Sequence, residues 1–339
     1  MPNYILYNND QIAARFAYAQ GMIRSYEPVH SELLPMQIRS TSAEGFTGWL
    51  RERAIDLNTV QHRNLVSELL GSHDKVHLSL MTHMFSISDT FTCFEEGQFV
   101  PRRHLCDPKE HEAVSDYILL SSDTSVRKAL PITPNVSTDG SFTKTWKYEN
   151  GEWWLYKLQS SEATRSEVEI SRVLRECGWD AALYCYVGSY RKRIKSLNFL
   201  GENEFFEPYD SFRYAFADVS EDDDIVMSNL SSLGEDYRHA WKRILLADAL
   251  FLNGDRHMRN FGVIRSAKTG EVLRLAPNFD NNQAFHGNPN GRYSSAMLRL
   301  YWETADSEDR ENLRQLLTVC EKNKYLTEAW QAGMQILNS

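Results

Sequence analysis

Three polar residues in the C-terminal half of this 339-residue chain have side chains suited to metal-assisted chemistry. Asp255 and Asn260 lie five residues apart in the segment LNGDRHMRNFGV, and Asp280 follows in LAPNFDNNQAF. The cluster around Asp255 stands between apolar runs, and a buried strand would leave its polar groups unpaired at a cost of several kcal/mol. We therefore predict a tight loop between two packed elements, where functional residues usually lie.

Phosphoryl transfer from ATP needs residues of these types. An Asp such as Asp255 can take the proton of the incoming hydroxyl, and an Asn with a second Asp, here Asn260 and Asp280, can hold Mg²⁺. A strand lysine neutralises phosphate oxygens, and Lys157 lies in the strand-like segment WWLYKL. A glycine-bearing turn such as that at Gly140 lets the backbone approach the phosphates. Each signal is weak alone, but their order along the chain is that of protein-kinase-like folds.

Several assignments stay open at this stage. Lys157 either reaches the edge of its strand or is paired inside the protein. The acid that would orient it is Glu167 or Glu169, which flank opposite edges of the apolar stripe of one helix, so periodicity does not choose between them. Arg256 is expected to pair with a carboxylate or a phosphorylated residue. His257 is expected to support the loop through hydrogen bonds.

Regular elements on both sides must position these side chains. Apolar spacing predicts a long helix over 235–252 that leads directly into the loop, and a hairpin over 262–277 that returns the chain to Asp280. A second hairpin, 142–158, turns at the residues ENG and carries Lys157. A helix over 161–178 follows, with Ser166 and Glu169 as a possible capping box and Gly178 at its end. Helices are also predicted over 46–55, 59–71 and 294–339, and short strands over 4–18, 182–187 and 194–199.

Composition limits the class of protein. Hydrophobic residues make up 42% of the chain and charged residues 24%, as in ordinary globular proteins. The net charge of -9 argues against a protein built mainly to bind nucleic acid. The five cysteines are scattered without a CxxC pair, so neither a disulfide framework nor a zinc site is expected. Without a signal peptide or an apolar run long enough to span a bilayer, we expect a cytoplasmic protein.

Two motifs together carry a family resemblance. LNGDRHMRNFGV followed by LAPNFDNNQAF resembles the catalytic and metal-binding motifs of the HipA-like kinases, including the CtkA-like branch. VSTDGSFTKTW resembles the phosphate-loop region of that family, and WWLYKL followed by SEVEISRVL resembles its lysine strand and glutamate helix. The match covers about residues 125–339, and residues 1–125 resemble, more weakly, the extra N-terminal region of some bacterial members.

The resemblance implies roles for individual residues. Gly140, Ser141 and Lys144 would contact the phosphates, and the family pattern favours Glu167 as the partner of Lys157. The adenine hinge would be SLNFL, residues 196–200, with Asn198 and Phe199 as contacts. A serine near the phosphate loop is a self-phosphorylation site in the family, which suggests Ser137.

The expected protein is therefore an α+β, two-lobed serine/threonine-protein kinase that uses ATP and Mg²⁺. The predicted domains are an accessory domain over 1–125, an N-lobe over 126–200 and a C-lobe over 201–339. The resemblance also implies a toxin-antitoxin-like role with an antitoxin-like or DNA-binding partner protein, whereas direct nucleic-acid binding is not expected.

Other functions remain open. No GxGxxG loop is present, and GDRHxxN also occurs in phosphoinositide-kinase-like proteins, so a lipid or small-molecule kinase is the first alternative. A non-catalytic binding module with a kinase fold is the second.

Overall fold

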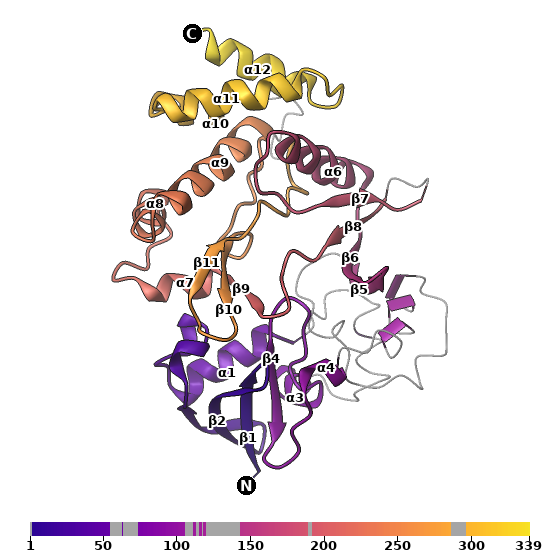
Figure 1. Ribbon diagram of the computed structural model, residues 1–339, viewed down its shortest axis with the longest axis vertical. Coiled ribbons are helices and arrows are strands. Elements are labelled where there is room, and N and C mark those ends of the chain that lie inside the picture. The colour runs from indigo at the N-terminus through magenta and orange to yellow at the C-terminus, as the bar shows by residue number, and fades with distance from the viewer. Residues whose placement is uncertain are drawn as a thin grey trace. The chain divides into compact units, whose positions relative to one another are not determined.

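The computed structural model describes residues 2–54, 63, 74–105, 111–112, 115–116, 118–119, 143–188, 192–285 and 296–339. The chain divides into two compact units, and Figure 1 labels the helices and strands that belong to them. Unit 1 comprises Met1–Leu158, Leu197–Glu207 and Ile264–Leu273, and unit 2 comprises Gln159–Ser196, Pro208–Val263 and Arg274–Ser339. This grouping by contacts differs from the three predicted domains, whose functional boundaries stay a prediction.

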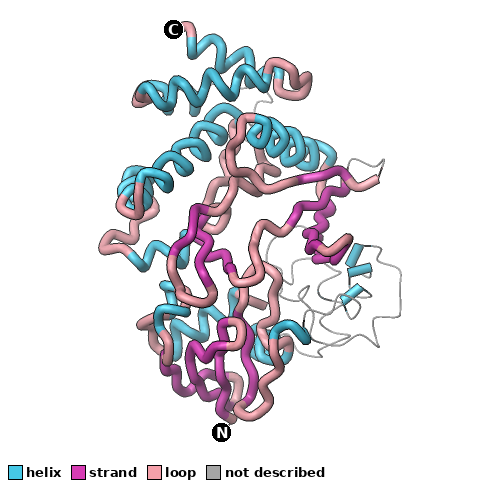
Figure 2. The backbone as a smooth tube through the Cα atoms, in the orientation of Figure 1, coloured by secondary structure: helices cyan, strands magenta, loops and turns pink. Residues whose placement is uncertain are grey.

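A four-stranded antiparallel sheet with the order β3-β2-β1-β4 forms the N-terminal part of unit 1 (Figure 2). Helix α1 packs against β3 and against helix α3. Leu6, Phe16, Phe46 and Phe91 belong to the apolar core between these elements. The elements of this part are β1 (Asn3–Asn8), β2 (Gln11–Ala19), β3 (Met22–Pro28), the 3-10 helices Ser31–Leu33 and Met36–Ile38, α1 (Ala43–Glu52), α3 (Lys75–Met81), β4 (Phe91–Glu95) and α4 (Arg102–Leu105).

The predicted ENG hairpin is confirmed in unit 1. Strands β5 (Thr143–Glu149) and β6 (Glu152–Leu158) pair in antiparallel register. The two turn residues, Asn150 and Gly151, both have positive φ, 53° and 91°. Two-residue hairpin turns of this kind need φ above zero at both positions, and Asn-Gly adopts that backbone readily.

The strand pairs predicted over 4–18 and 262–277 are also present. The first corresponds to β1 and β2. The second corresponds to β10 (Gly262–Ser266) and β11 (Val272–Leu275), which form a three-stranded sheet with β9 (Glu204–Pro208) in the order β11-β10-β9. The strands predicted over 182–187 and 194–199 are β7 (Tyr184–Tyr186) and β8 (Arg193–Leu197), which pair antiparallel.

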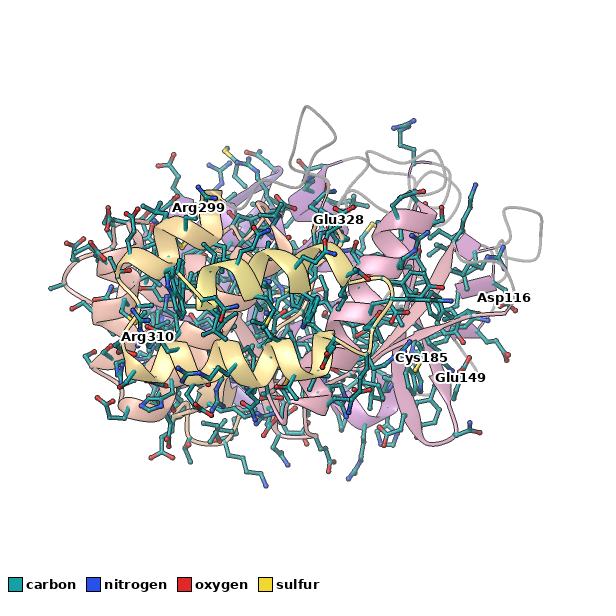
Figure 3. The ribbon with its side chains drawn as sticks, turned by 90° about the horizontal axis from the view of Figure 1, so that it is seen from above. Asp116, Glu149, Cys185, Arg299, Arg310 and Glu328 are labelled. Carbon is teal, nitrogen blue, oxygen red and sulfur yellow. The ribbon has the colours of Figure 1, made fainter. Side chains whose placement is uncertain are left out.

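Unit 2 is built mainly from helices (Figure 2). Its apolar core includes Ile170, Leu174, Leu250 and Leu317. Helices α11 and α12 run antiparallel beside each other, and Figure 3 shows Arg310 and Glu328, near the starts of the two helices, at opposite ends of the pair. The helices of this unit are α6 (Ser161–Glu176), α7 (Tyr209–Phe212), the 3-10 helix Arg213–Ala215, α8 (Asp223–Ser231), α9 (Glu235–Phe251), α10 (Ala296–Glu303), α11 (Ser307–Cys320) and α12 (Thr327–Leu337).

The capping box predicted at Ser166 and Glu169 is wrong. Helix α6 begins earlier, and the hydroxyl of Ser160 accepts a hydrogen bond from the Ala163 amide as its N-cap. Ser166 lies inside the helix, with its hydroxyl 3.1 Å from the carbonyl oxygen of Glu162. The apolar run of this helix begins one turn after its true start, and for that reason the pattern placed the cap too late.

On α9, Leu245 is only partly buried, whereas Leu246 is fully buried. The helix expected over 59–71 lies outside the described residues except at position 63.

Candidate active site

The loop that follows α9 folds back on itself at Asp255. Helix α9 ends where Leu252 adopts a left-handed conformation, with φ of 52°. The carbonyl oxygen of Asp255 then accepts hydrogen bonds from the His257 amide and from the side-chain amide of Asn260, both at 2.9 Å. Asp255 is exposed, whereas Asn260 is 6% exposed. The loop therefore presents the Asp255 carboxylate to solvent and orients Asn260 by its own backbone.

Arg256 connects this loop to the segment that carries Asp280. Its Nε and Nη2 atoms donate to the two carboxylate oxygens of Asp248 at 2.8 and 2.9 Å. Its Nη1 donates to the carbonyl oxygens of Asn260 and Phe279, each at 2.7 Å, and Nη2 also donates to Oδ1 of Asn281 at 3.0 Å. Since one nitrogen binds both carbonyl oxygens, the backbones at Asn260 and next to Asp280 lie close together.

The Arg256–Asp248 pair is buried and electrostatically matched. The side chains are 7% and 5% exposed. Burial lowers the pKa of Arg256 and the Asp248 carboxylate raises it, and the net shift is upward. Arg256 was expected to pair with a carboxylate or a phosphorylated residue, and the carboxylate is confirmed.

The exposed His257 supports the loop as a hydrogen-bond acceptor, because its Nδ1 accepts from the Arg259 amide at 3.2 Å.

Asp280 is held in an unusual backbone conformation. Its φ is 61°, in the left-handed region that Asp tolerates better than most residues. Its backbone amide donates to the phenolic oxygen of Tyr184 at 3.2 Å. Its Oδ1 accepts from the side-chain amide of Asn282, also at 3.2 Å. The first contact holds the backbone at Asp280, and the second holds one of its carboxylate oxygens.

The oxygen atoms at this place fit a magnesium ion. Mg²⁺ is usually held by one or two carboxylates, with water and phosphate oxygens completing its octahedron. Asp280 supplies a carboxylate and Asn260 an amide. The side-chain oxygen Oδ1 of Asn282, beside Asp280, is buried and has no hydrogen-bond partner among the described residues. This oxygen is therefore available as a further ligand of the ion. The described residues contain no cluster of three or more His, Cys, Asp or Glu side chains that could hold a metal by itself.

The two glutamates of α6 have different surroundings in unit 2. Glu169 is 2% exposed and accepts from Arg172, from the Tyr186 hydroxyl at 3.1 Å and from the Asn323 amide at 3.0 Å. Glu167 is fully buried and accepts from the Gln159 amide at 3.0 Å. Glu169 thus has three hydrogen-bond partners, and the lysine-orienting role of Glu167 stays a prediction.

In unit 1, two lysines lie opposite each other in the β5–β6 hairpin. Lys144 and Lys157 are directly paired in the strand register, so their side chains leave the same face of the hairpin. Lys157 is 6% exposed and Lys144 is partly buried. Like charges at directly opposed positions destabilise a strand pair.

The remaining predicted contacts are in unit 1 or outside the described residues. Asn198 donates its backbone amide to the Trp153 carbonyl at 2.9 Å, and its side-chain oxygen accepts from the Leu200 amide. Phe199 packs edge-on against Phe206, with ring centroids 6.2 Å apart. The predicted phosphate-loop residues Gly140 and Ser141, and the candidate self-phosphorylation residue Ser137, lie outside the described residues.

Sequence reasoning missed the residues that support the loop. Asp248 belongs to the apolar run ILLADALF of α9, where a carboxylate inside an otherwise buried stripe was the available signal. A buried carboxylate needs a cationic partner, and Arg256 is only eight residues away. Tyr184 had no comparable signal, since an aromatic residue in a short strand is ordinary.

Comparison with solved structures assigns the fold. The chain is similar to HipA of Shewanella oneidensis MR-1, solved in a complex of the toxin-antitoxin system HipA, HipB and its operator DNA. The TM-score is 0.57 at 12% identity, and the match covers 98% of this chain and 91% of HipA. A second similar structure is the proinflammatory kinase CtkA of Helicobacter pylori, with a TM-score of 0.45 at 12% identity over 59% of this chain and 88% of CtkA.

Sequence comparison adds no relative. No family model matches the chain, and no curated protein matches it. No described helix is both long enough and apolar enough to cross a bilayer. The expected resemblance to HipA is confirmed at the level of the fold: the chain has a mixed α/β fold similar to that of HipA.

Proposed function

We propose that this protein is a kinase that transfers the γ-phosphoryl group of ATP, with Mg²⁺, to a serine or threonine of a protein. The observation that carries the proposal is the convergence of the Asp255–Asn260 loop with the Asp280 segment through Arg256. A scaffold without catalysis has no need to bring a solvent-facing carboxylate together with two magnesium-type ligands.

Each residue has one proposed role. Asp255 orients the acceptor hydroxyl and takes its proton, and its exposure allows an acceptor to reach it. Asn260 and Asp280 hold the magnesium ion, which neutralises charge on the phosphates when bound. Lys157 contacts the α- and β-phosphates, and Glu167 orients Lys157. Lys144, opposite Lys157 on β5, contributes a second positive charge.

The remaining contacts are proposed from the family resemblance. Gly140 and Ser141 would approach the phosphates with their backbone, and Asn198 and Phe199 would contact the adenine. The likeness to HipA, solved with HipB and operator DNA, supports a proposal that this chain has an antitoxin-like protein partner. It gives no support to the expectation that the chain itself avoids nucleic acid. A cytoplasmic location stays a prediction.

The test is a transfer assay with γ-labelled ATP and Mg²⁺. Three acceptor sets are offered separately: a protein extract from which lipids have been removed, phosphoinositide vesicles, and the purified chain alone. Label on serine or threonine of proteins supports the proposal, and the Asp255→Asn variant should abolish it. Label confined to lipid would establish the phosphoinositide-kinase alternative. No transfer to any acceptor, with no binding of ATP, would leave the non-catalytic binding module.

A further inference from the structure

Arg256 donates to groups on both sides of the proposed metal position. On one side it binds the carbonyl oxygen of Asn260, and on the other the carbonyl oxygen of Phe279 and Oδ1 of Asn281, the two neighbours of Asp280. It also donates to both oxygens of Asp248 and, at 3.5 Å, to Oδ1 of Asn278. The guanidinium therefore fixes two chain segments by several short bonds while its own position is fixed by helix α9.

We propose that Arg256, held by Asp248, is a positioning residue that sets the separation of the metal-binding oxygens of Asn260 and Asp280. On this account, which rests on the proposed kinase function, Arg256 controls the affinity for the divalent metal in the nucleotide complex. It does not control the affinity for the nucleotide itself. Neither Arg256 nor Asp248 contacts substrate.

The geometry of magnesium makes such a device necessary. Mg²⁺ requires a nearly ideal octahedron with ligands at about 2.0–2.1 Å, so small displacements of a ligand reduce affinity. Asn260 and Asp280 belong to different segments, and Nη1 of Arg256 binds the carbonyl oxygens of Asn260 and of Phe279, next to Asp280. The segments are also joined by the Ala276 amide, which donates to the Gly262 carbonyl at 2.8 Å, and by the Asn253 side-chain amide, which donates to Oδ1 of Asn281 at 3.4 Å. Groups that orient metal ligands typically change metal affinity by roughly 10- to 100-fold when they are replaced.

The chemistry of arginine explains why this residue type is required. A planar guanidinium can donate to both oxygens of a carboxylate with one edge and to other acceptors with the rest of its five N–H groups. A lysine ammonium has three donors at one point and cannot span Asp248, Asn260 and Phe279 together. Arg256→Lys therefore keeps the charge but loses the bridge.

The key variants are Arg256→Lys and Asp248→Asn, with Arg53→Lys as the matched control. Arg53 has similar bonding in unit 1, where it donates to both oxygens of Asp89 at 2.7 and 2.9 Å and to the Met84 carbonyl at 3.0 Å. It is not part of the proposed site. A loss of stability common to buried arginine–aspartate pairs would therefore appear in Arg53→Lys as well.

Two binding constants are measured on the full-length protein. The first is for Mn²⁺ as a paramagnetic probe, titrated in the presence of a saturating non-hydrolysable ATP analogue. The second is for a fluorescent ATP analogue in EDTA. We expect Arg256→Lys and Asp248→Asn to weaken Mn²⁺ binding by roughly 10- to 100-fold. We expect metal-free nucleotide binding to stay within about twofold of the parent, and Arg53→Lys to change neither constant.

The outcomes separate this inference from the proposed function. If the folded variants bind Mn²⁺ as tightly as the parent, or lose nucleotide and metal affinity equally, the positioning role is rejected while the kinase proposal stands. If the parent itself shows no nucleotide-dependent Mn²⁺ binding, both fail. Should Arg256→Lys not fold, Asn281→Ala provides the test, because it removes one Arg256 contact on the Asp280 side without leaving a buried charge unpaired. An unchanged Mn²⁺ constant in that variant would also reject the role.

Discussion

The backbone amide of Asp280 donates a hydrogen bond to the phenolic oxygen of Tyr184 across 3.2 Å, and both residues belong to unit 2. The chain segments that carry them also meet at a parallel bridge between Ala181 and Asn278. Asp280 has φ of 61°, so its amide direction differs from that of an extended residue. Tyr184 therefore helps to stabilise the backbone conformation from which the Asp280 carboxylate is proposed to bind a metal.

Tyr184→Phe should reduce the contribution of Mg²⁺ to nucleotide-induced stabilisation. Removing the acceptor costs about 0.5–1.5 kcal/mol in unfolding free energy, and Asp280 becomes less well fixed. Ligand that binds only the folded state raises the melting temperature. We expect a smaller Mg²⁺-dependent rise with ATP in Tyr184→Phe, and almost none in Asp280→Asn. A full Mg²⁺-dependent rise in Asp280→Asn would place the metal elsewhere.

Asp255→Asn should separate catalysis from binding. The side chain is exposed and is proposed to act on the acceptor hydroxyl, so ATP affinity should stay nearly unchanged. Transfer should fall by roughly 100- to 10,000-fold, the usual contribution of a general base. Single-turnover transfer and nucleotide binding are measured on the same preparation. Asp236→Asn, an exposed carboxylate in the first turn of α9, is the control and should keep full activity. Full turnover in Asp255→Asn would remove the loop from the catalytic assignment.

The two glutamates of α6 should respond differently to replacement by glutamine. Glu169 accepts from Arg172, Tyr186 and Asn323, so Glu169→Gln should destabilise the protein by about 1–3 kcal/mol and leave ATP binding unchanged. Glu167→Gln should weaken ATP binding and transfer together. Chemical denaturation and nucleotide titration of both variants are the measurements. The reverse pattern would assign the lysine-orienting role to Glu169.

Self-phosphorylation is predicted in the segment TPNVSTDGSFTK, residues 133–144, at Ser137. A phosphate there would add about -1.5 to -2 charges near groups proposed to bind ATP phosphates, and should oppose ATP binding. Intact mass after incubation with ATP, followed by peptide mapping, measures it, and Ser137→Ala should lose the modified peptide. An increase in mass confined to other peptides would reject this switch without affecting the kinase proposal.

Stability at low pH should depend on the ion pair between Asp306 and Lys242. Their charged atoms are 2.6 Å apart. The hydrogen bond from Lys242, followed by one from the Asp309 backbone, lowers the pKa of Asp306 from 3.8 to about 2. The stabilisation is therefore fully present above about pH 4 and is lost as the pH falls through the folded-state value near 2.

Denaturation midpoints measured between pH 2 and pH 5 test this pair. Asp306→Asn should keep the N-cap of α11 but lose part of the pH dependence in this range, and Lys242→Gln should have the same effect. If the variants and the parent lose stability in parallel on acidification, the pair does not contribute.

Local sequence was sufficient to predict most of the helices and strands and the residue types of the candidate active site. The turn at Asn150 and Gly151, the apolar stripe of α9 and the loop around Asp255 follow from backbone preferences and from the cost of burying unpaired polar groups, which act over a few residues. The start of α6 at Ser161 was predicted correctly, but its capping residue was not, because several serines can cap a helix and only packing selects one of them.

Tertiary structure alone decided how the polar loop is held. Asp248 and Arg256 form their pair because α9 is buried and a carboxylate there needs a cation. Arg256 then joins Asn260 to Phe279, nineteen positions along the chain, across a hairpin whose exact register no local pattern specifies. The surroundings of Glu169 likewise depend on Asn323, which lies far away in sequence. Such contacts follow from packing of distant segments, and for that reason spacing could suggest the residues of the site but not what positions them.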